Sequence, residues 1–195
     1  MKVLYVHGYN GDPYGSSYNH LKKAAGESHE LLSVDYNAED PREAIAIIRK
    51  AVMEQGIDCV IGASLGGFLT MHIFGVSRMI INPCWNPANE LPHVGYTGET
   101  AVYSTLLERF KENTDIEEKN LCSVCIAPQD ELLGERYRDV LESHFRHVYE
   151  ISGGHRICEE SAKEIINRYL PKHDENVRTF VKQLKGMDNL PMWDI

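Results

Sequence analysis

A serine between glycines is the feature of this sequence whose residue types and spacing most directly suggest chemistry. Residues 62–66 read Gly-Ala-Ser-Leu-Gly, a G-x-S-x-G pattern centred on Ser64. The pattern follows the apolar run 58–61 and precedes the helical run 68–75. In this strand–turn–helix setting a serine hydroxyl projects from a sharp turn as a nucleophile. The structural alternative is a helix N-cap serine flanked by turn glycines.

The glycines of this pattern have a physical role. A serine on such a turn has strained backbone angles, and the chain passes so closely that a side chain at Gly62 or Gly66 would clash. The following helix directs its N-terminus at the hydroxyl, which favours negative charge developing there. We therefore predict that Ser64 is a nucleophile for acyl transfer.

A second cluster, His7-Gly8-Tyr9-Asn10, follows the first apolar run. Acyl transfer needs two hydrogen-bond donors aimed at the developing oxyanion. The N–H of Leu65, directly after the serine, is one candidate. The N–H of Tyr9 is the best candidate for the other, with Asn10 next. We expect His7 to brace this loop, because its own segment has to form the oxyanion hole; as a plain surface turn, the cluster needs no chemistry.

Serine is a weak nucleophile unless a base takes its proton. Among nine histidines, His155 stands out because two glycines precede it in the loop after the last predicted strand. These glycines give the loop the freedom to bring the imidazole to Ser64. We expect His144 and His147 at the surface, and no motif surrounds the remaining histidines, which are His20, His29, His72, His93 and His173.

The acid that orients the imidazole is expected between Ser64 and His155, in the chain order serine, acid, histidine. Asp130 follows the apolar run 121–126 and is the best candidate. It would hold the imidazole in one tautomer and stabilise the imidazolium. Glu131 is the second candidate and Asp115 the third. The structural alternative for Asp130 is an N-cap on the following helix.

These residues need a sheet to bring them together, and the chain alternates short apolar runs with helical patterns. The predicted strands are residues 2–6, 30–35, 58–62, 78–82, 121–127 and 148–151. The predicted helices are residues 17–25, 41–56 with Asp40 as N-cap, 65–75, 135–142, 159–169 and 175–184. This alternation predicts an α/β fold, a three-layer α/β/α sandwich whose doubly wound, mainly parallel sheet has about six strands.

The predicted strand order begins 2-1-3, which gives the candidate site its place. The order reverses between the first and third strands, and ligands bind at such a switch point. These two strands end at Gly8 and at Ser64. The loop after the first strand is therefore expected beside the nucleophile.

Two segments break the alternation within what we predict to be a single domain, residues 1–195. Residues 84–120 begin with many turn residues and continue with an amphipathic helix, so we predict a lid or insertion over the carboxyl edge of the sheet. Residues 171–195 are predicted to form a helix and an irregular tail that ends in Pro-Met-Trp-Asp-Ile.

Composition narrows the classes of partner. The 195 residues carry a formal net charge of −9, which disfavours binding to nucleic acid or to anionic membranes. The N-terminal apolar run is too short for a signal peptide and no run reaches membrane-span length, so we expect a cytoplasmic protein.

Cys122 and Cys125 have metal-site spacing but fall in one predicted strand, where residues three apart face opposite sides. We therefore expect reduced core cysteines.

Five stretches together resemble a known family, the bacterial YqiA/YcfP-like small esterases of the α/β-hydrolase superfamily. They are residues 7–13, 61–70, 80–87, 127–133 and 153–157. The resemblance implies a minimal α/β-hydrolase fold, a Ser64–Asp130–His155 triad and hydrolysis of small acyl esters or thioesters. With it, Asn10, Trp85 and Tyr103 become candidate substrate contacts. Trp85, Tyr103 and Phe110 can instead form a small core of their own segment.

The sequence thus predicts a serine hydrolase that acts on a small-molecule acyl ester through an acyl-enzyme, with no metal or organic cofactor. The acyl length, the leaving group and the oligomeric state stay open at this point. A serine peptidase or an acyltransferase would use the same three residues. A non-catalytic relative that binds a ligand or a protein is the alternative from another class.

Overall fold

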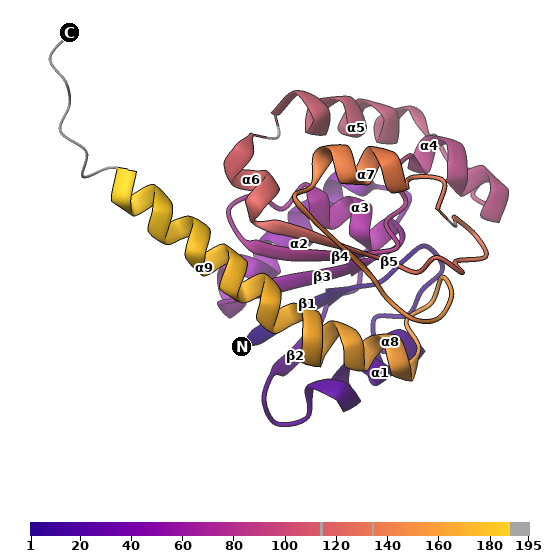
Figure 1. The fold of residues 1–195 in the computed structure, drawn as a ribbon. Coiled ribbons are helices and arrows are strands. Elements are labelled where there is room, and N and C mark those ends of the chain that lie inside the picture. The colour runs from indigo at the N-terminus through magenta and orange to yellow at the C-terminus, as the bar shows by residue number, and fades with distance from the viewer. Residues whose placement is uncertain (114, 134, 188–195) are drawn as a thin grey trace, which may run out of the picture.

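Six parallel strands form the centre of the structure, a computed structural model that describes residues 1–113, 115–133 and 135–187. Their order across the sheet is β2-β1-β3-β4-β5-β6, so the predicted 2-1-3 beginning is confirmed (Figure 1). The strands are β1 Lys2–Val6, β2 Glu30–Ser33, β3 Cys59–Ala63, β4 Ser77–Ile81, β5 Cys122–Ile126 and β6 His147–Glu150.

Helices cover both faces of this sheet (Figure 1). On one face lie α2 Pro41–Gln55, α3 Leu65–Met71, α5 Ala101–Asn113 and α7 Arg138–His144. On the other lie α1 Ser16–Ala25, α8 Glu159–Lys163, the π-helical segment η2 Glu164–Tyr169 and the start of α9 Leu170–Met187. The shorter elements are α4 Pro87–Glu90, the 3-10 helix η1 Leu91–Val94 and α6 Ile116–Asn120.

Alternate strand residues supply two cores. Leu4 packs with α2, α3 and α5, whereas Val3 packs with α1, α8 and η2. Because side chains alternate along a strand, each strand contributes to both layers. The predicted three-layer α/β/α architecture is therefore confirmed. Cys122 and Cys125 belong to opposite cores, as their spacing predicted, and all five cysteines are free.

The helix that precedes β3 shows how local sequence sets an element's ends. The Asp40 carboxylate accepts the N–H groups of Arg42 and Glu43, and Pro41 takes the first helical position. The helix ends at Gly56, which has a left-handed conformation with φ 62°. Both ends agree with the sequence prediction.

Two helix predictions need correction. α3 ends at Met71 instead of continuing to residue 75, since the chain turns there to enter β4. Residues 159–187 form one helical run, where the sequence predicted two separate helices. Pro171 lies at the junction of η2 and α9, where the hydrogen-bond pattern changes and a missing N–H is tolerated.

Residues 84–113 and 115–120 hold helices and no strand, as predicted. Their longest helix, α5, turns its aromatic side chains toward α3: the rings of Tyr103 and Phe68 lie 5.9 Å apart, and those of Phe110 and His72 lie 5.8 Å apart. This segment is therefore anchored on the sheet through its own apolar core. The predicted tail Pro-Met-Trp-Asp-Ile lies outside the described residues. Across the part of the chain that the structure describes, no helix has both the length and the apolar character to cross a bilayer.

Two histidines are buried far from the carboxyl edge of the sheet. His173 on α9 has Nδ1 2.7 Å from the Ser123 hydroxyl and Nε2 2.8 Å from the Ser77 hydroxyl, so it joins α9 to β4 and β5. His72 lies between the rings of Phe68 and Phe110. Burial lowers the pKa of each imidazole from 6.5 to about 4.

These imidazoles predict a loss of stability in mild acid. The unfolded chain takes up protons near pH 6.5 and the folded chain only near pH 4, so the free energy of unfolding falls as pH drops between these values, by up to ~3 kcal/mol for each histidine. His72→Gln and His173→Gln should each flatten this dependence in urea unfolding at pH 7.5 and 5.0. The exposed His93→Gln is the control, and equal slopes in all four proteins would contradict the prediction.

Candidate active site

Ser64 lies on a sharp turn between β3 and α3. Its backbone has φ 54° and ψ −120°, a conformation that residues with a side chain rarely adopt. Hydrogen bonds fix the turn on both sides: the Ser64 N–H donates to Ile81 O at 2.9 Å, and the Ser64 carbonyl accepts the N–H of Cys84 at 3.1 Å. The strained backbone is thus held by the neighbouring strand β4 and the chain that follows it.

The glycines around the serine are required by close packing. A Cβ at Gly66 would lie 2.2 Å from the carbonyl oxygens of Val6 and His7, and one at Gly62 would lie 2.4 Å from the Gly66 carbonyl oxygen. Such distances are too short for any side chain, so only glycine fits. This contact places the end of β1 directly against the serine turn.

Three side chains from different strand ends form a hydrogen-bonded chain. His155 Nε2 lies 2.9 Å from Ser64 Oγ, and His155 Nδ1 lies 2.7 Å from Asp130 Oδ2. Ser64 follows β3, Asp130 follows β5 and His155 follows β6, and the carboxyl ends of these parallel strands share one edge of the sheet. The geometry therefore brings together the three residues that the sequence singled out, in an arrangement that activates a serine hydroxyl.

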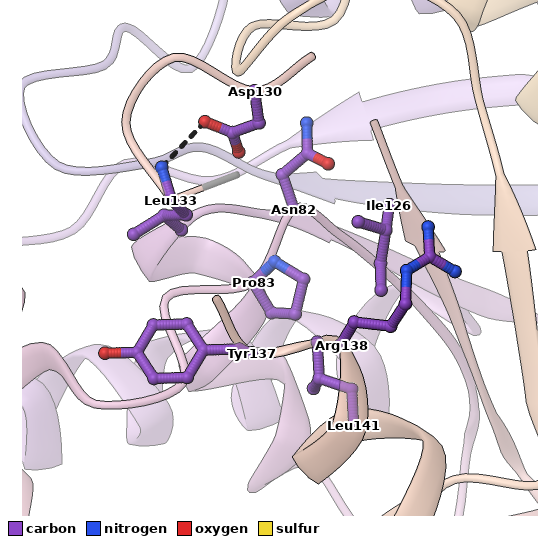
Figure 2. Close-up of a pocket in the computed structure, with 8 residues that line it drawn as sticks. All are labelled: Asn82, Pro83, Ile126, Asp130, Leu133, Tyr137, Arg138 and Leu141. Atoms are coloured by element: carbon purple, nitrogen blue, oxygen red, sulfur yellow. Dashed lines mark hydrogen bonds between the residues drawn. The ribbon is translucent and has the colours of Figure 1, made fainter. Parts of the chain in front are cut away.

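Asp130 uses its two oxygens for different purposes. Oδ1 accepts the N–H groups of Leu132 and Leu133, the second of which Figure 2 shows, while Oδ2 faces His155. The cap-like role and the bond to the imidazole are thus both present. The side chain is only 1% exposed. Burial by itself raises the pKa of Asp130, but the hydrogen bonds from His155 and the two N–H groups outweigh it and lower the pKa, so the carboxylate is charged.

The other two candidate acids have different contacts. Glu131 Oε2 accepts the backbone N–H of His155 at 2.9 Å, and this bond lowers the pKa of Glu131. Asp115 caps α6 by accepting the N–H of Glu118. The Glu131 side chain therefore holds the histidine loop by binding the backbone of His155, whereas Asp115 belongs to another part of the structure.

Asn82 is a supporting residue that the sequence analysis missed. Its side-chain amide donates to the carbonyl oxygens of Gly154 and His155, both at 3.1 Å, and accepts the N–H of Ala127 at 2.7 Å. It joins the end of β4 to the loops that carry the histidine and the aspartate. The available signal in the sequence was an asparagine at the end of a predicted strand, at this edge of the sheet; in the structure its φ is 42°, which asparagine tolerates better than most residues.

The loop after β1 is braced by His7, as predicted. The His7 ring stacks on Tyr36 with centroids 4.4 Å apart, and the Tyr36 hydroxyl donates to the His7 carbonyl at 2.5 Å. A Cβ at Gly8 would lie 3.0 Å from the Ser64 Cβ, so the loop touches the serine. The next residue, Tyr9, lines the same cavity as Ser64.

A cavity of about 540 Å³ opens above Ser64 and His155, a volume within the range of small-molecule sites. Asn10 lines it, and its role as a substrate contact stays a prediction. Trp85 and Tyr103 do not line it, which corrects their assignment as substrate contacts. Both are buried, because α5 turns Tyr103 toward Phe68 of α3, and Trp85, in the chain after β4, packs against Phe110. Over the described residues, no group of three histidines, cysteines or carboxylates is placed to hold a metal ion.

Comparisons with known proteins agree with this geometry. A family model described as an uncharacterised protein family, UPF0227, matches residues 2–157. Est1E from Butyrivibrio proteoclasticus is 12% identical, with a TM-score of 0.65 over 89% of this chain and 88% of its own. MGS-MChE2, described as an α/β hydrolase from a lagoon-sediment metagenome, is 13% identical, with a TM-score of 0.62 over 90% and 91% of the two chains. The esterase domain from Rhodothermus marinus is 16% identical, with a TM-score of 0.62 over 87% and 84%. The resemblance to α/β hydrolases is thereby confirmed at the level of the fold.

The glycine contact at the turn yields a prediction. Gly66→Ala should destabilise the protein by about 1–3 kcal/mol, because the methyl group pushes the β1 loop away from α3. It should also lower the reactivity of Ser64 toward a fluorophosphonate probe. Gly75→Ala is the control: Gly75 has φ 75° but open space around it, so this change should cost about 1 kcal/mol and leave labelling unchanged. Undiminished labelling of Gly66→Ala would count against a turn that depends on this contact.

Proposed function

The chain belongs to the uncharacterised protein family UPF0227 and has the α/β-hydrolase fold, and from this premise we propose that it is a serine hydrolase of small acyl esters or thioesters. One observation carries the proposal: the His155 imidazole bridges the Ser64 hydroxyl and a buried, charged carboxylate, at 2.9 and 2.7 Å. One of the similar structures is described as an esterase domain, at an identity of 16%.

In the first half of the proposed reaction, His155 Nε2 takes the proton of Ser64 as Oγ attacks the ester carbonyl. Asp130 keeps the proton on Nδ1 and stabilises the imidazolium that forms. The carbonyl oxygen becomes an oxyanion, which the N–H groups of Tyr9 and Leu65 are proposed to bind. Leu65 is the first residue of α3, so its N–H has no partner in the helical pattern.

Collapse of the tetrahedral intermediate breaks the bond to the leaving group. His155 Nε2 gives its proton to the departing alcohol or thiol, and an acyl-Ser64 ester remains. Water then enters the open cavity, His155 takes its proton, and the same donors bind the second oxyanion. Release of the acid returns the proton to Ser64 Oγ. Every proton in this proposed cycle passes through His155, so no metal or organic cofactor is required.

Ser64→Ala tests the nucleophile. We expect hydrolysis of short p-nitrophenyl esters to fall by about five to six orders of magnitude, to the residual rate that substrate binding and the oxyanion donors provide, and labelling by a fluorophosphonate probe to disappear. Circular dichroism and the urea midpoint serve as folding controls. Hydrolysis at the wild-type rate would reject Ser64. Absence of labelling in the wild type would favour a binding protein, and transfer to an added alcohol in place of water would indicate an acyltransferase.

Asp130→Asn tests the acid, with Glu131→Gln as a matched control. The amide at position 130 favours the wrong tautomer of His155, so kcat should fall by about three to four orders of magnitude. Glu131→Gln removes charge from the bond to the His155 backbone and should change kcat by about tenfold or less. If the two variants lose activity to the same extent, the assignment of separate roles to these carboxylates is wrong.

A further inference from the structure

The cavity above Ser64 has two unlike walls. One comes from the loop after β1 and the start of α1, and its residues are polar: Asn10, Asp12, Ser16 and Ser17. The other comes from η1 and the turn after β5, where Leu91, Val94, Leu132 and Leu133 present apolar side chains and Glu90, His93 and Glu131 also line the cavity; we call it the apolar wall. Val94 and Leu132 are 40% and 47% exposed. This wall presents apolar surface to water beside the serine, and such surface gains free energy when a ligand covers it.

Proton transfer from His155 decides which wall faces the leaving group and which wall faces the acyl group. The leaving group must lie within reach of His155 Nε2, which protonates it. The residues after His155 run toward α1, where His20 Nδ1 lies 3.0 Å from the Ile157 carbonyl oxygen. The segment that carries His155 therefore borders the cavity on the side of the polar wall, and the leaving group of the proposed reaction is assigned to that side. The acyl group is assigned to the other side, toward Cys84, whose N–H binds the Ser64 carbonyl at 3.1 Å, and η1.

The two halves of the apolar wall come from segments far apart in sequence, and Glu90 joins them. Its carboxylate accepts Arg136 Nη1 with both oxygens, at 2.7 and 2.8 Å, and also accepts the Tyr137 hydroxyl. Glu90 is the last residue of α4, directly before Leu91, whereas Arg136 and Tyr137 follow the turn that carries Leu132.

Glu90 and Arg136 differ in their exposure to water. The Glu90 side chain is 12% exposed and that of Arg136 is 56% exposed, so water screens the guanidinium more than the carboxylate. Burial, followed by the bond to Glu90, raises the pKa of the Tyr137 hydroxyl well above its ordinary value, which keeps the donor protonated. Tyr137 and Leu133 also line one small cavity behind Asp130 (Figure 2). The hydrogen bonds of Glu90 therefore connect the apolar wall to a small cavity that Asp130 also lines.

We propose that Glu90 is a positioning residue, which clamps η1 to the turn after β5 and so shapes a subsite for an apolar acyl chain between Val94 and Leu132. This inference rests on the proposed function and deepens it, because it gives the substrate an apolar acyl group and a polar leaving group. The Glu90 clamp contacts neither Ser64 nor the oxyanion. It therefore affects which acyl chain length the protein prefers, and not the chemical step.

The wild-type protein should therefore prefer longer acyl chains over acetate. Each methylene that the wall covers should raise kcat/KM about fourfold along the p-nitrophenyl acetate, butanoate, hexanoate and octanoate series, until the wall is filled. Val94→Trp fills part of the subsite and should lower the hexanoate-to-acetate ratio of kcat/KM, with acetate hydrolysis retained.

Glu90→Gln tests the clamp itself. It keeps the shape of the side chain and removes the charge that binds Arg136. The hexanoate-to-acetate ratio should fall about fifteenfold, the equivalent of about two uncovered methylenes, while kcat for acetate stays within about twofold. Arg136→Gln should give the same ratio, and the double variant should be no worse than either single one. Glu142→Gln is the matched control, an exposed carboxylate that pairs with Arg138 on α7, and should keep the wild-type ratio.

The outcomes separate this inference from the proposed function. If hydrolysis depends on Ser64 but Glu90→Gln lowers all esters in parallel, or none, the clamp and its subsite are refuted and the hydrolase stands. The same holds if wild-type kcat/KM does not rise beyond acetate. If no ester is hydrolysed and no probe labels Ser64, the proposed function itself fails. A fall confined to the longer esters, in Glu90→Gln and Arg136→Gln alike, supports the clamp.

Discussion

The contact between the serine turn and the end of β1 is the constraint on which the site depends. Ser64 has a left-handed backbone, and this conformation persists because α3 is pressed against the carbonyl oxygens of Val6 and His7 at Gly66. The same contact places the loop after β1 within reach of the serine. Parallel pairing of β1 and β3 holds the two segments in register. The proposed nucleophile and the candidate oxyanion donors are thus positioned by one packing contact.

Residues whose role depends on local chain geometry could be predicted from the sequence. Ser64 and its glycines have a pattern that belongs to one kind of turn. Asp130 and His155 each follow a strand, and parallel strands bring their carboxyl ends to one edge whatever lies between them. The six strands were found for a similar reason, since a strand covered on both faces is a continuous apolar run.

Residues whose role depends on packing between distant segments could not be predicted. Trp85 and Tyr103 have the side chains of a ligand pocket, but packing between segments buries them: α5 turns Tyr103 toward Phe68 of α3, and Trp85, in the chain after β4, packs on Phe110 of α5. Asn82 joins two loops that lie 45 and 72 residues further along the chain. Glu90 and Arg136 are likewise paired only by the fold. The helices predicted at residues 159–169 and 175–184 form one run, because Pro171 falls where the π-helical pattern gives way to α9 and therefore does not break the helix.

The two oxygens of Asp130 have different partners, and this limits how the carboxylate can move. With Oδ1 bound to two consecutive amides of the turn, the carboxylate is unable to swivel and follow the imidazole. Any displacement of the imidazole must then come from rotation of its own side chain or from the loop that bears it. That loop is held in turn, because Glu131 binds the His155 N–H and Asn82 binds the carbonyl oxygens of Gly154 and His155. Rotation of the His155 side chain is therefore the movement that these hydrogen bonds restrict least.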